Sequence, residues 1–161
     1  MEFSERHKNS LIVGIISDTH GALPPSAINA LSCADLIIHA GDIGKPAILD
    51  NLQKIAPVFP VKGNMDKGEW TVKLPDTEVI NKGGVLLYVL HDASNLDLDP
   101  AAAGFSAVIS GHTHRPLIEE HDGVLFINPG SAAQPRSNYP PSIVLLRIKD
   151  KNLDPRFVSL K

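Results

Sequence analysis

Short apolar runs alternate with polar loops through the first half of the chain. Residues 11–16 form a short, continuous apolar run, the pattern of a strand buried on both faces, and further strands are predicted over 35–40 and 57–61. Helices are predicted over 24–32 and 46–54, and each begins at a proline, which the first turn of a helix tolerates. This alternation of strand and helix favours right-handed crossovers and a largely parallel sheet.

The second half of the chain has the pattern of hairpins. Residues 82–84 and 121–123 contain the glycines of two predicted hairpin turns, and a short helix is predicted around 101–103. Strands are predicted over residues 77–81, 85–90, 107–110, 117–120, 124–127, 142–148 and 156–160. We therefore expect a mixed α/β sandwich with antiparallel strands in its second half. It forms a single domain over 11–161 after a polar tail over 1–10, and the pattern leaves the order of strands open.

Side chains able to bind metal ions follow five of the predicted strands, at the point where each strand ends. They are Asp18, His20, Asp42, Asn64, Asp66, His91, His112 and His114. In α/β folds, ligands bind outside the carboxyl ends of the strands, where the loops converge. We therefore expect these side chains to come together although they are far apart in the chain.

Each of these motifs alone has an ordinary structural explanation. Asp and Asn often cap helices, and Asn after a glycine suits a left-handed turn. Two imidazoles two residues apart in a loop, at His112 and His114, are harder to explain by packing. The ordered set favours a metal centre. Even without Asp66, the seven remaining nitrogen and oxygen ligands, none of them a thiolate, are too many for one zinc ion, and they suit two ions that share a carboxylate.

Composition and charge exclude several classes of protein. The chain has 161 residues, 43% of them hydrophobic, and a formal net charge of −3, so it lacks the basic stripe of a nucleic-acid-binding protein. Its apolar runs are too short to span a membrane, and residues 1–10 lack the apolar run of a signal peptide. A single cysteine, Cys33, fits a reducing compartment. We expect a cytoplasmic protein without a membrane partner.

The ordered motifs resemble those of a known family. The series Asp18-x-His20, Gly41-Asp42, Gly63-Asn64-x-Asp66, His91 and Gly111-His112-x-His114 is similar to that of the calcineurin-like metallophosphoesterases, and the short chain resembles their small bacterial and archaeal phosphodiesterases, the YfcE-like proteins. The resemblance implies a four-layer α-β-β-α sandwich with two mixed central sheets. It also implies a centre of two divalent metal ions, most often Mn²⁺, with Ni²⁺, Co²⁺, Zn²⁺ or Fe as alternatives.

The resemblance also implies a role for each residue. The first ion would be held by Asp18, His20 and His114, the second by Asn64, His91 and His112, and Asp42 would bridge the two. The expected catalytic residues are Asn64, His112 and Asp66. The expected contacts to the substrate phosphate come from Asn64, Ser131 and Arg136, although the segment from Asn128 to Ser131 also has the composition of a plain turn.

Two positions depart from the family pattern. Met65 stands where many relatives have a histidine that protonates the leaving group, and Asp92 follows His91 where many have glycine. The predicted reaction is hydrolysis of a small phosphate diester by a hydroxide that the two ions share, with aryl diesters preferred because a proton donor is missing. The alternatives are a phosphomonoesterase and a metal-bound interaction scaffold. The oligomeric state, monomer or homo-oligomer, is left open.

Overall fold

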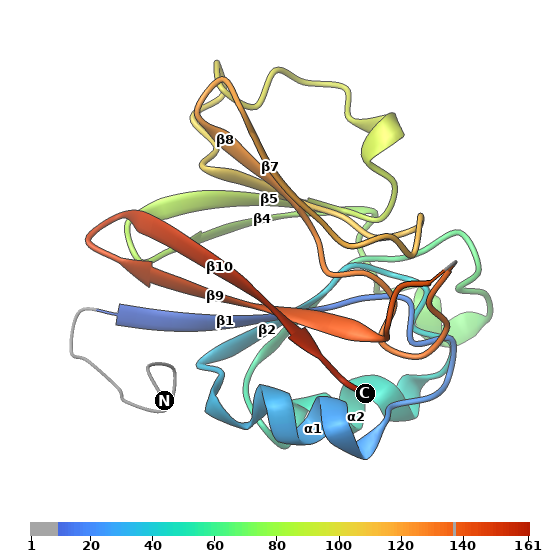
Figure 1. The fold of residues 1–161 in the computed structure, drawn as a ribbon. Helices are drawn as coiled ribbons and strands as arrows, with labels where there is room; N and C mark the ends of the chain where they lie inside the picture. The colour runs from blue at the N-terminus through green and yellow to red at the C-terminus, as the bar shows by residue number, and fades with distance from the viewer. Residues whose placement is uncertain (1–9, 137) are drawn as a thin grey trace.

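The computed structural model describes residues 10–136 and 138–161, and the chain forms two five-stranded sheets that pack face to face (Figure 1). The strands are β1 (Ser10–Ile16), β2 (Leu36–His39), β3 (Val58–Pro60), β4 (Thr77–Lys82), β5 (Val85–Leu90), β6 (Ala107–Ile109), β7 (Leu117–His121), β8 (Val124–Asn128), β9 (Ser142–Lys149) and β10 (Asn152–Ser159). The helices are α1 (Pro25–Ala30) and α2 (Pro46–Gln53), with the short 3-10 helices η2 (Leu31–Cys33), η3 (Glu69–Thr71) and η4 (Ala93–Asn95). The predicted polar tail lies outside the described residues except for Ser10, which begins β1.

The first sheet has the order β10-β9-β1-β2-β3. Its β1, β2 and β3 are parallel, as the alternation of strands and helices predicted, and β9 and β10 add an antiparallel hairpin beside β1. The hairpin strand β10 begins at Asn152, earlier than the predicted start at residue 156. Both α-helices begin at a proline in the first turn, as expected. The crossovers therefore bring the carboxyl ends of β1, β2 and β3 to one edge.

The second sheet has the order β4-β5-β6-β8-β7. Both predicted hairpins form, β4 with β5 and β7 with β8. The middle of the sheet is parallel, because β6 lies between β5 and β8 and runs in the same direction as both. The second half is therefore more mixed than a set of antiparallel strands, and β5 and β6 end at the same edge.

The apolar core has three parts, one between the two sheets and one on the outer face of each sheet. Val13 and Ile15 of β1 pack between the sheets, while Ile12 and Ile16 of the same strand face the helices. The two-sided burial of β1 explains its continuous apolar run. Gly14 lies in the same strand because a Cβ there would overlap the side chain of Leu31, next to α1.

The outer face of the second sheet is covered by the segment around η4, whose Leu96, Leu98 and Phe105 pack against the sheet. The fourth layer of the sandwich is therefore a 3-10 helix and loop. The helix predicted around 101–103 is a series of turns that ends at Gly104, whose φ of 87° is left-handed.

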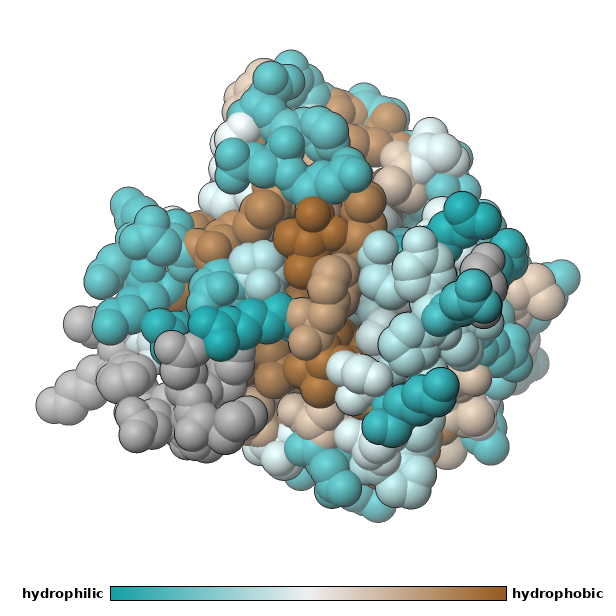
Figure 2. Space-filling view, viewed as in Figure 1, coloured by the Kyte–Doolittle hydropathy of each residue, from teal (hydrophilic) through white to brown (hydrophobic). Residues whose placement is uncertain are grey.

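The surface in the view of Figure 2 has its apolar side chains gathered near the middle, where the two sheets approach each other, with hydrophilic residues around them. Phe157, on the edge strand β10, is 45% exposed. No helix in the described part of the chain is long and apolar enough to cross a membrane.

Candidate metal centre

Seven side chains from five loops meet where β1, β2, β3, β5 and β6 end. Because these strands run in parallel within each sheet, the loops that follow them lie at one edge of the sandwich. The converging side chains are Asp18, His20, Asp42, Asn64, His91, His112 and His114. The tertiary structure thus brings together all seven residues that the motif pattern selected as metal ligands.

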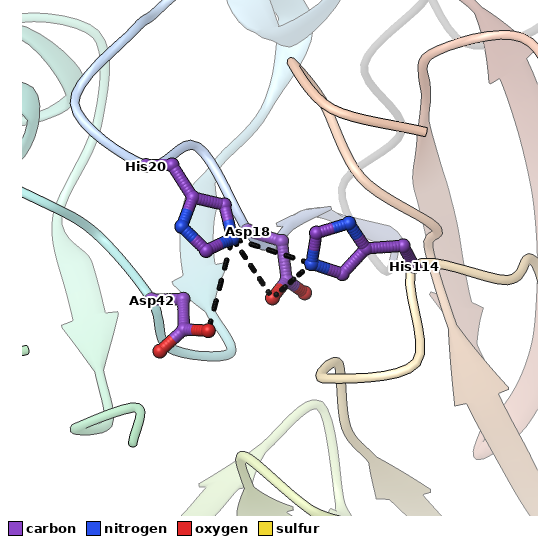
Figure 3. Close-up of side chains that lie close together, drawn as sticks. All are labelled: Asp18, His20, Asp42 and His114. Carbon is purple, nitrogen blue, oxygen red and sulfur yellow. Dashed lines mark hydrogen bonds and ion pairs between the residues drawn. The ribbon is translucent and has the colours of Figure 1, made fainter. Parts of the chain in front are cut away.

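The first group consists of Asp18, His20, Asp42 and His114, whose ligand atoms all lie within 4.8 Å of one another (Figure 3). The Nε2 atoms of His20 and His114 are 3.2 Å apart, and His114 Nε2 is 3.2 Å from Asp18 Oδ1. His20 Nε2 is 3.7 Å from both Asp18 Oδ1 and Asp42 Oδ2. Two imidazole nitrogens and two carboxylate oxygens therefore face one small volume, which suits a divalent transition metal.

The second group is formed by Asn64, His91 and His112. Asn64 Oδ1 lies 3.0 Å from His91 Nε2 and 3.2 Å from His112 Nδ1. His91 Nε2 also lies 3.3 Å from Asp42 Oδ2, the same oxygen that is 3.7 Å from His20 Nε2. Asp42 therefore stands between the two groups and offers one oxygen to both.

Backbone carbonyls orient two of the imidazole rings. His114 Nδ1 is 2.5 Å from the carbonyl oxygen of Gln134, and His91 Nδ1 is 2.7 Å from that of Ala40. A carbonyl oxygen can only accept a hydrogen bond, so both Nδ1 atoms carry a proton. In the neutral rings the lone pair of Nε2 therefore points at the carboxylate and amide oxygens, which also carry lone pairs. Such an arrangement is unfavourable without a cation and fits the second-sphere orientation of metal-binding histidines.

Asp18 supplies the clearest fit to a cation. Its Oδ1 is the one buried side-chain nitrogen or oxygen in the described residues that lacks a hydrogen-bond partner. Its Oδ2 is satisfied by the Ser17 hydroxyl at 2.6 Å and by the His112 N–H at 3.0 Å. Burial raises the pKa of the Asp18 carboxyl above its usual value, although these hydrogen bonds and the nearby imidazoles act in the opposite direction. A bound cation would satisfy the unpaired oxygen.

The charges of Asp42 and His91 depend on each other. Burial alone would raise the pKa of Asp42, but the hydrogen bonds from His91 and from the Met65 N–H outweigh it and lower that pKa. Burial alone would lower the pKa of His91, but its bonds to Asp42 and Ala40 outweigh it and raise that pKa. Positive charge close to Asp42 is therefore favoured at this point between the two groups, and a bound metal ion would supply it.

The ligand loops have an unusual backbone. Among the described residues, eight non-glycine residues have left-handed φ angles, and five of them belong to the candidate ligands. These five are Asp18 (55°), His20 (48°), Asp42 (55°), His112 (72°) and His114 (61°). Left-handed φ is uncommon for such residues, and it persists where surrounding contacts enforce it, often at functional sites.

Two glycines that precede ligand residues allow close approach of the loops. A Cβ on Gly111 would overlap Ser17 Oγ and Asp18 Oδ2, and a Cβ on Gly63 would overlap the backbone and Oδ1 of Asp42. Glycine is needed at both positions because no other residue leaves this space. The glycines of the Gly-Asn and Gly-His motifs therefore belong to the construction of the site.

Asp66 and Ser131, expected to have catalytic and substrate-binding roles, are engaged in holding loops. Asp66 is buried and accepts hydrogen bonds from the Gly44 and Gly63 N–H groups, at 3.0 and 2.9 Å. Ser131 is fully buried, donates to the Asp18 carbonyl at 2.8 Å and accepts from the Gln134 N–H at 2.7 Å. The hydroxyl of Ser131 is thus turned towards the backbone and supports the Asp18 loop, and its contact with phosphate stays a prediction.

The Asn128–Ser131 segment lies beside the candidate ligands. Asn128 Nδ2 donates to the Gly111 carbonyl at 2.8 Å and lies 3.1 Å from Thr113 Oγ1, which holds the loop of the two neighbouring histidines. Arg136, further along, is exposed, and its contact with phosphate stays a prediction.

A cavity of about 690 Å³ opens beside the second group of ligands, where Asn64, His91 and His112 form part of its wall. Most of the remaining wall is polar or charged, and it comes from the loop after β3, the start of β4 and the segment around η4. This cavity has the size of a small-molecule site. The site can therefore hold metal ions at its base and a small ligand beside them.

The chain is similar to known metallophosphoesterases in sequence and in fold. A probable metallophosphoesterase of Methanocaldococcus jannaschii is 37% identical over 155 residues, which cover 88% of this chain and 78% of the relative. The solved structure of an archaeal phosphodiesterase superposes with a TM-score of 0.79 at 25% identity, covering 92% of this chain and 99% of that chain. Vps29 of Entamoeba histolytica, solved in complex with zinc, superposes with a TM-score of 0.72 at 25% identity, covering 94% and 100%.

The family profile matches nearly the whole domain. The profile described as the calcineurin-like phosphoesterase superfamily domain matches residues 11–151. This match and the archaeal neighbours confirm both the resemblance inferred from the motifs and the predicted α/β fold with two mixed sheets. The chain belongs to the calcineurin-like phosphoesterase superfamily.

Proposed function

We propose that this metallophosphoesterase is a phosphodiesterase with two divalent ions. Asp18, His20 and His114 would hold one ion, Asn64, His91 and His112 the other, and Asp42 would bridge them. The observation that carries the proposal is the position of Asp42 Oδ2, 3.7 Å from His20 Nε2 and 3.3 Å from His91 Nε2. An oxygen shared by two ligand groups is what a two-ion site requires.

Mn²⁺ is the proposed metal, because a mixture of imidazole nitrogens with carboxylate and amide oxygens suits an ion of intermediate hardness. Ni²⁺, Co²⁺, Zn²⁺ and Fe are the alternatives that the same donors accept. When bound, two such ions would lower the pKa of water to supply the nucleophile and would offset negative charge on the phosphate.

The protein's own residues would orient the phosphate. Asn64 turns Oδ1 towards His91 and His112, at 3.0 and 3.2 Å, which leaves its amide Nδ2 as a donor to a phosphate oxygen. Asn64 is exposed beside the cavity, so a substrate can reach it. Asp66 would act as a positioning residue, since it ties the Gly63 loop to the Gly44 loop.

The leaving group would depart without a proton from residue 65. The Met65 side chain is 58% exposed and carries no proton to donate, while its backbone N–H is bound to Asp42 Oδ1 at 2.8 Å. A leaving group with a low pKa needs little protonation, so aryl diesters should react faster than alkyl diesters.

The charges of the cavity favour a diester over a monoester. Its exposed wall carries Lys62 and Lys67 but also Asp76, Asp92 and Asp97. A phosphate diester has one negative charge near neutral pH and a monoester has close to two. Excess carboxylates beside the site would repel the dianion more strongly. The cavity of about 690 Å³ would also accommodate the second ester group.

The experiment is hydrolysis of bis(p-nitrophenyl) phosphate by metal-stripped protein, with and without added Mn²⁺. We compare the wild type with Asp42→Ala, which removes the shared oxygen, and with His121→Ala as a matched control. His121 lies in the β7–β8 hairpin, and its side chain is 62% exposed. Turnover that needs Mn²⁺, is lost in Asp42→Ala and is kept in His121→Ala would support the proposal.

The two alternatives are outcomes of the same assay series. A wild type that hydrolyses p-nitrophenyl phosphate but not the diester, with Mn²⁺, Ni²⁺, Co²⁺ or Zn²⁺, would show a phosphomonoesterase instead. A protein that binds metal but hydrolyses neither ester would favour an interaction role like that of a scaffold. The structural similarity to Vps29 is the reason for testing the interaction role. A cytoplasmic location stays a prediction.

A further inference from the structure

Asp92 is a carboxylate that the proposed reaction has not yet used. It follows the candidate ligand His91 and precedes η4, where its Oδ1 accepts hydrogen bonds from Ser94 N at 3.0 Å and from Ser94 Oγ at 2.8 Å. These two bonds fix the orientation of the carboxylate. The second oxygen, Oδ2, is thereby turned towards His112 and lies 3.7 Å from its Nε2.

His112 stands between Asp92 and the second group of ligands. Its Nδ1 lies 3.2 Å from Asn64 Oδ1, on the side of the ring that faces His91, and its Nε2 faces Asp92. The two imidazoles of His91 and His112 are nearly perpendicular, at 76°, with centroids 5.2 Å apart. A ring that presents Nδ1 to an ion must carry its proton on Nε2, and a carboxylate on that side would stabilise this tautomer.

The imidazole rings of His91 and His114 are also oriented by an acceptor for the N–H that faces away from the ion, but there the acceptor is a backbone carbonyl. His91 and His114 bind their ions through Nε2 in the proposed scheme, and each has its Nδ1 proton on a backbone carbonyl, of Ala40 or Gln134. His112 is turned the opposite way, and the group that faces its outer nitrogen is the carboxylate of Asp92, where the other two rings have a backbone carbonyl. Its side chain is also 40% exposed, compared with 6% for His91 and 8% for His114, so packing constrains it less.

We propose that Asp92 is a positioning residue: its charge, 3.7 Å from His112 Nε2, would hold the proton on that nitrogen and turn Nδ1 of the ring towards a metal ion. The inference rests on the proposed two-ion function and extends it to a residue outside the ligand set. A carboxylate that accepts the free N–H of a ligating histidine fixes the ring and raises its basicity, and losing such a partner costs about 10- to 100-fold in metal affinity. Both side chains are partly exposed, so we expect the lower part of that range.

The test is stepwise binding of Mn²⁺ to metal-stripped protein, measured by calorimetry. Asp92→Ala should lower the affinity for one of the two ions about 10-fold and leave the affinity for the other unchanged. Asp92→Asn, which keeps an oxygen acceptor without the charge, should fall between the wild type and Asp92→Ala. Ser94→Ala, which removes one of the two hydrogen bonds to Oδ1 of Asp92 and keeps the backbone one, should have a smaller effect in the same direction.

The control is Asp97→Ala. Asp97 is an exposed carboxylate on the wall of the same cavity, so its removal changes the local charge without removing the contact to His112. It should leave both binding steps nearly unchanged. In the diester assay, saturating Mn²⁺ should restore both kcat and KM of Asp92→Ala, whereas loss of a substrate contact would leave KM raised.

The outcomes separate this inference from the function on which it rests. If the wild type binds two ions and Asp92→Ala binds both as tightly, the positioning role is overturned and the two-ion function stands. If Asp97→Ala and Asp92→Ala weaken binding equally, the effect is that of general charge, which also overturns the role. A wild type that binds a single ion overturns the two-ion function itself, and with it the inference.

Discussion

His39 Nε2 lies 3.0 Å from Thr19 Oγ1, and both residues are fully buried. The Thr19 hydroxyl donates to the Ile43 carbonyl at 2.8 Å, so its oxygen accepts the proton of His39 Nε2. The other nitrogen, His39 Nδ1, accepts from the Gly41 N–H at 3.1 Å. This neutral imidazole therefore joins the loop that contains Asp18 and His20 to the loop that contains Asp42.

The first prediction concerns acid stability. Burial lowers the pKa of His39 to about 3, with the nearby His91 acting in the same direction. The unfolded chain binds a proton at His39 below pH 6.5, so the free energy of unfolding should fall as pH drops from 6.5 towards 3. The slope from this one group is about 1.4 kcal/mol per pH unit at most.

The measurement is urea unfolding at several pH values for the wild type and for His39→Gln, which cannot take up a proton. The variant should be less stable at pH 7, because it loses the bridge to Thr19, but its stability should fall less steeply between pH 6 and 4. Parallel pH profiles for the two proteins would contradict a neutral buried His39.

The second prediction concerns the unpaired oxygen of Asp18. Asp18→Asn replaces a buried carboxylate without a partner on Oδ1, so the metal-free protein should gain about 1 kcal/mol or more in stability. The same change removes a metal ligand. Added Mn²⁺ should therefore raise the Tm of the wild type, by the equivalent of about 2.7 kcal/mol per ion at 100 times Kd, and raise the Tm of the variant by clearly less.

Thermal unfolding with and without Mn²⁺ measures both effects. Asp97→Asn, at an exposed position, serves as the control and should behave like the wild type. A metal-induced rise in Tm that survives undiminished in Asp18→Asn would mean that the ion binds without this residue.

The third prediction concerns the space at Gly111. Gly111→Ala should cost about 1–3 kcal/mol in stability and weaken metal binding, because the new Cβ overlaps Ser17 Oγ and Asp18 Oδ2. The double variant Ser17→Ala/Gly111→Ala removes one of the overlapping atoms and should recover part of the loss. Urea unfolding of the three variants checks this, and an additive double variant would show that the two positions do not interact.

The fourth prediction concerns the missing proton donor. Met65 is 58% exposed and contributes only its backbone N–H to Asp42, so Met65→His can add an imidazole without disturbing the loop. A general acid contributes about 10²–10⁴-fold to rate, and alkyl leaving groups need it most. The ratio of alkyl to aryl diester hydrolysis should therefore rise at least about tenfold.

Met65→Gln is the matched control, since it is polar but cannot donate a proton at neutral pH. The relevant measurement is kcat/KM for one alkyl and one aryl diester in the three proteins. If both variants change the two rates by the same factor, proton donation at residue 65 is not what limits the alkyl diester.

The pattern of apolar residues was sufficient to predict most of the strands. The strand β1 can be predicted from the sequence because it is buried on both faces, which requires a continuous apolar run. The prediction of a helix over 101–103 is wrong. Three alanines have a high helix propensity, but Gly104 has a left-handed φ and ends the segment after a few turns. Burial on both faces made β1 predictable, and the residue that follows the three alanines prevented the predicted helix.

The candidate metal ligands could also be predicted from the sequence. A metal needs particular donor atoms, so residue type and order alone identify Asp42 and the pair His112 and His114 as chemistry rather than packing. Asp66 and Ser131 could not be assigned in this way, since a carboxylate and a hydroxyl serve loops and ligands equally well. Their backbone partners, Gly44 and Asp18, are remote in the chain.

The amino-acid sequence by itself determined which residues have the chemistry of a metal centre, and it placed them after strands, because donor type and hydrophobic periodicity are local properties. Only the tertiary structure decided that Asp42 Oδ2 lies between His20 and His91, that Asp18 Oδ1 has no partner and that Asp92 faces His112. These relationships depend on how the two sheets stack and on the left-handed turns of five loop residues. Distances of a few ångströms between loops that are remote in the chain are set by packing, and no local pattern encodes them.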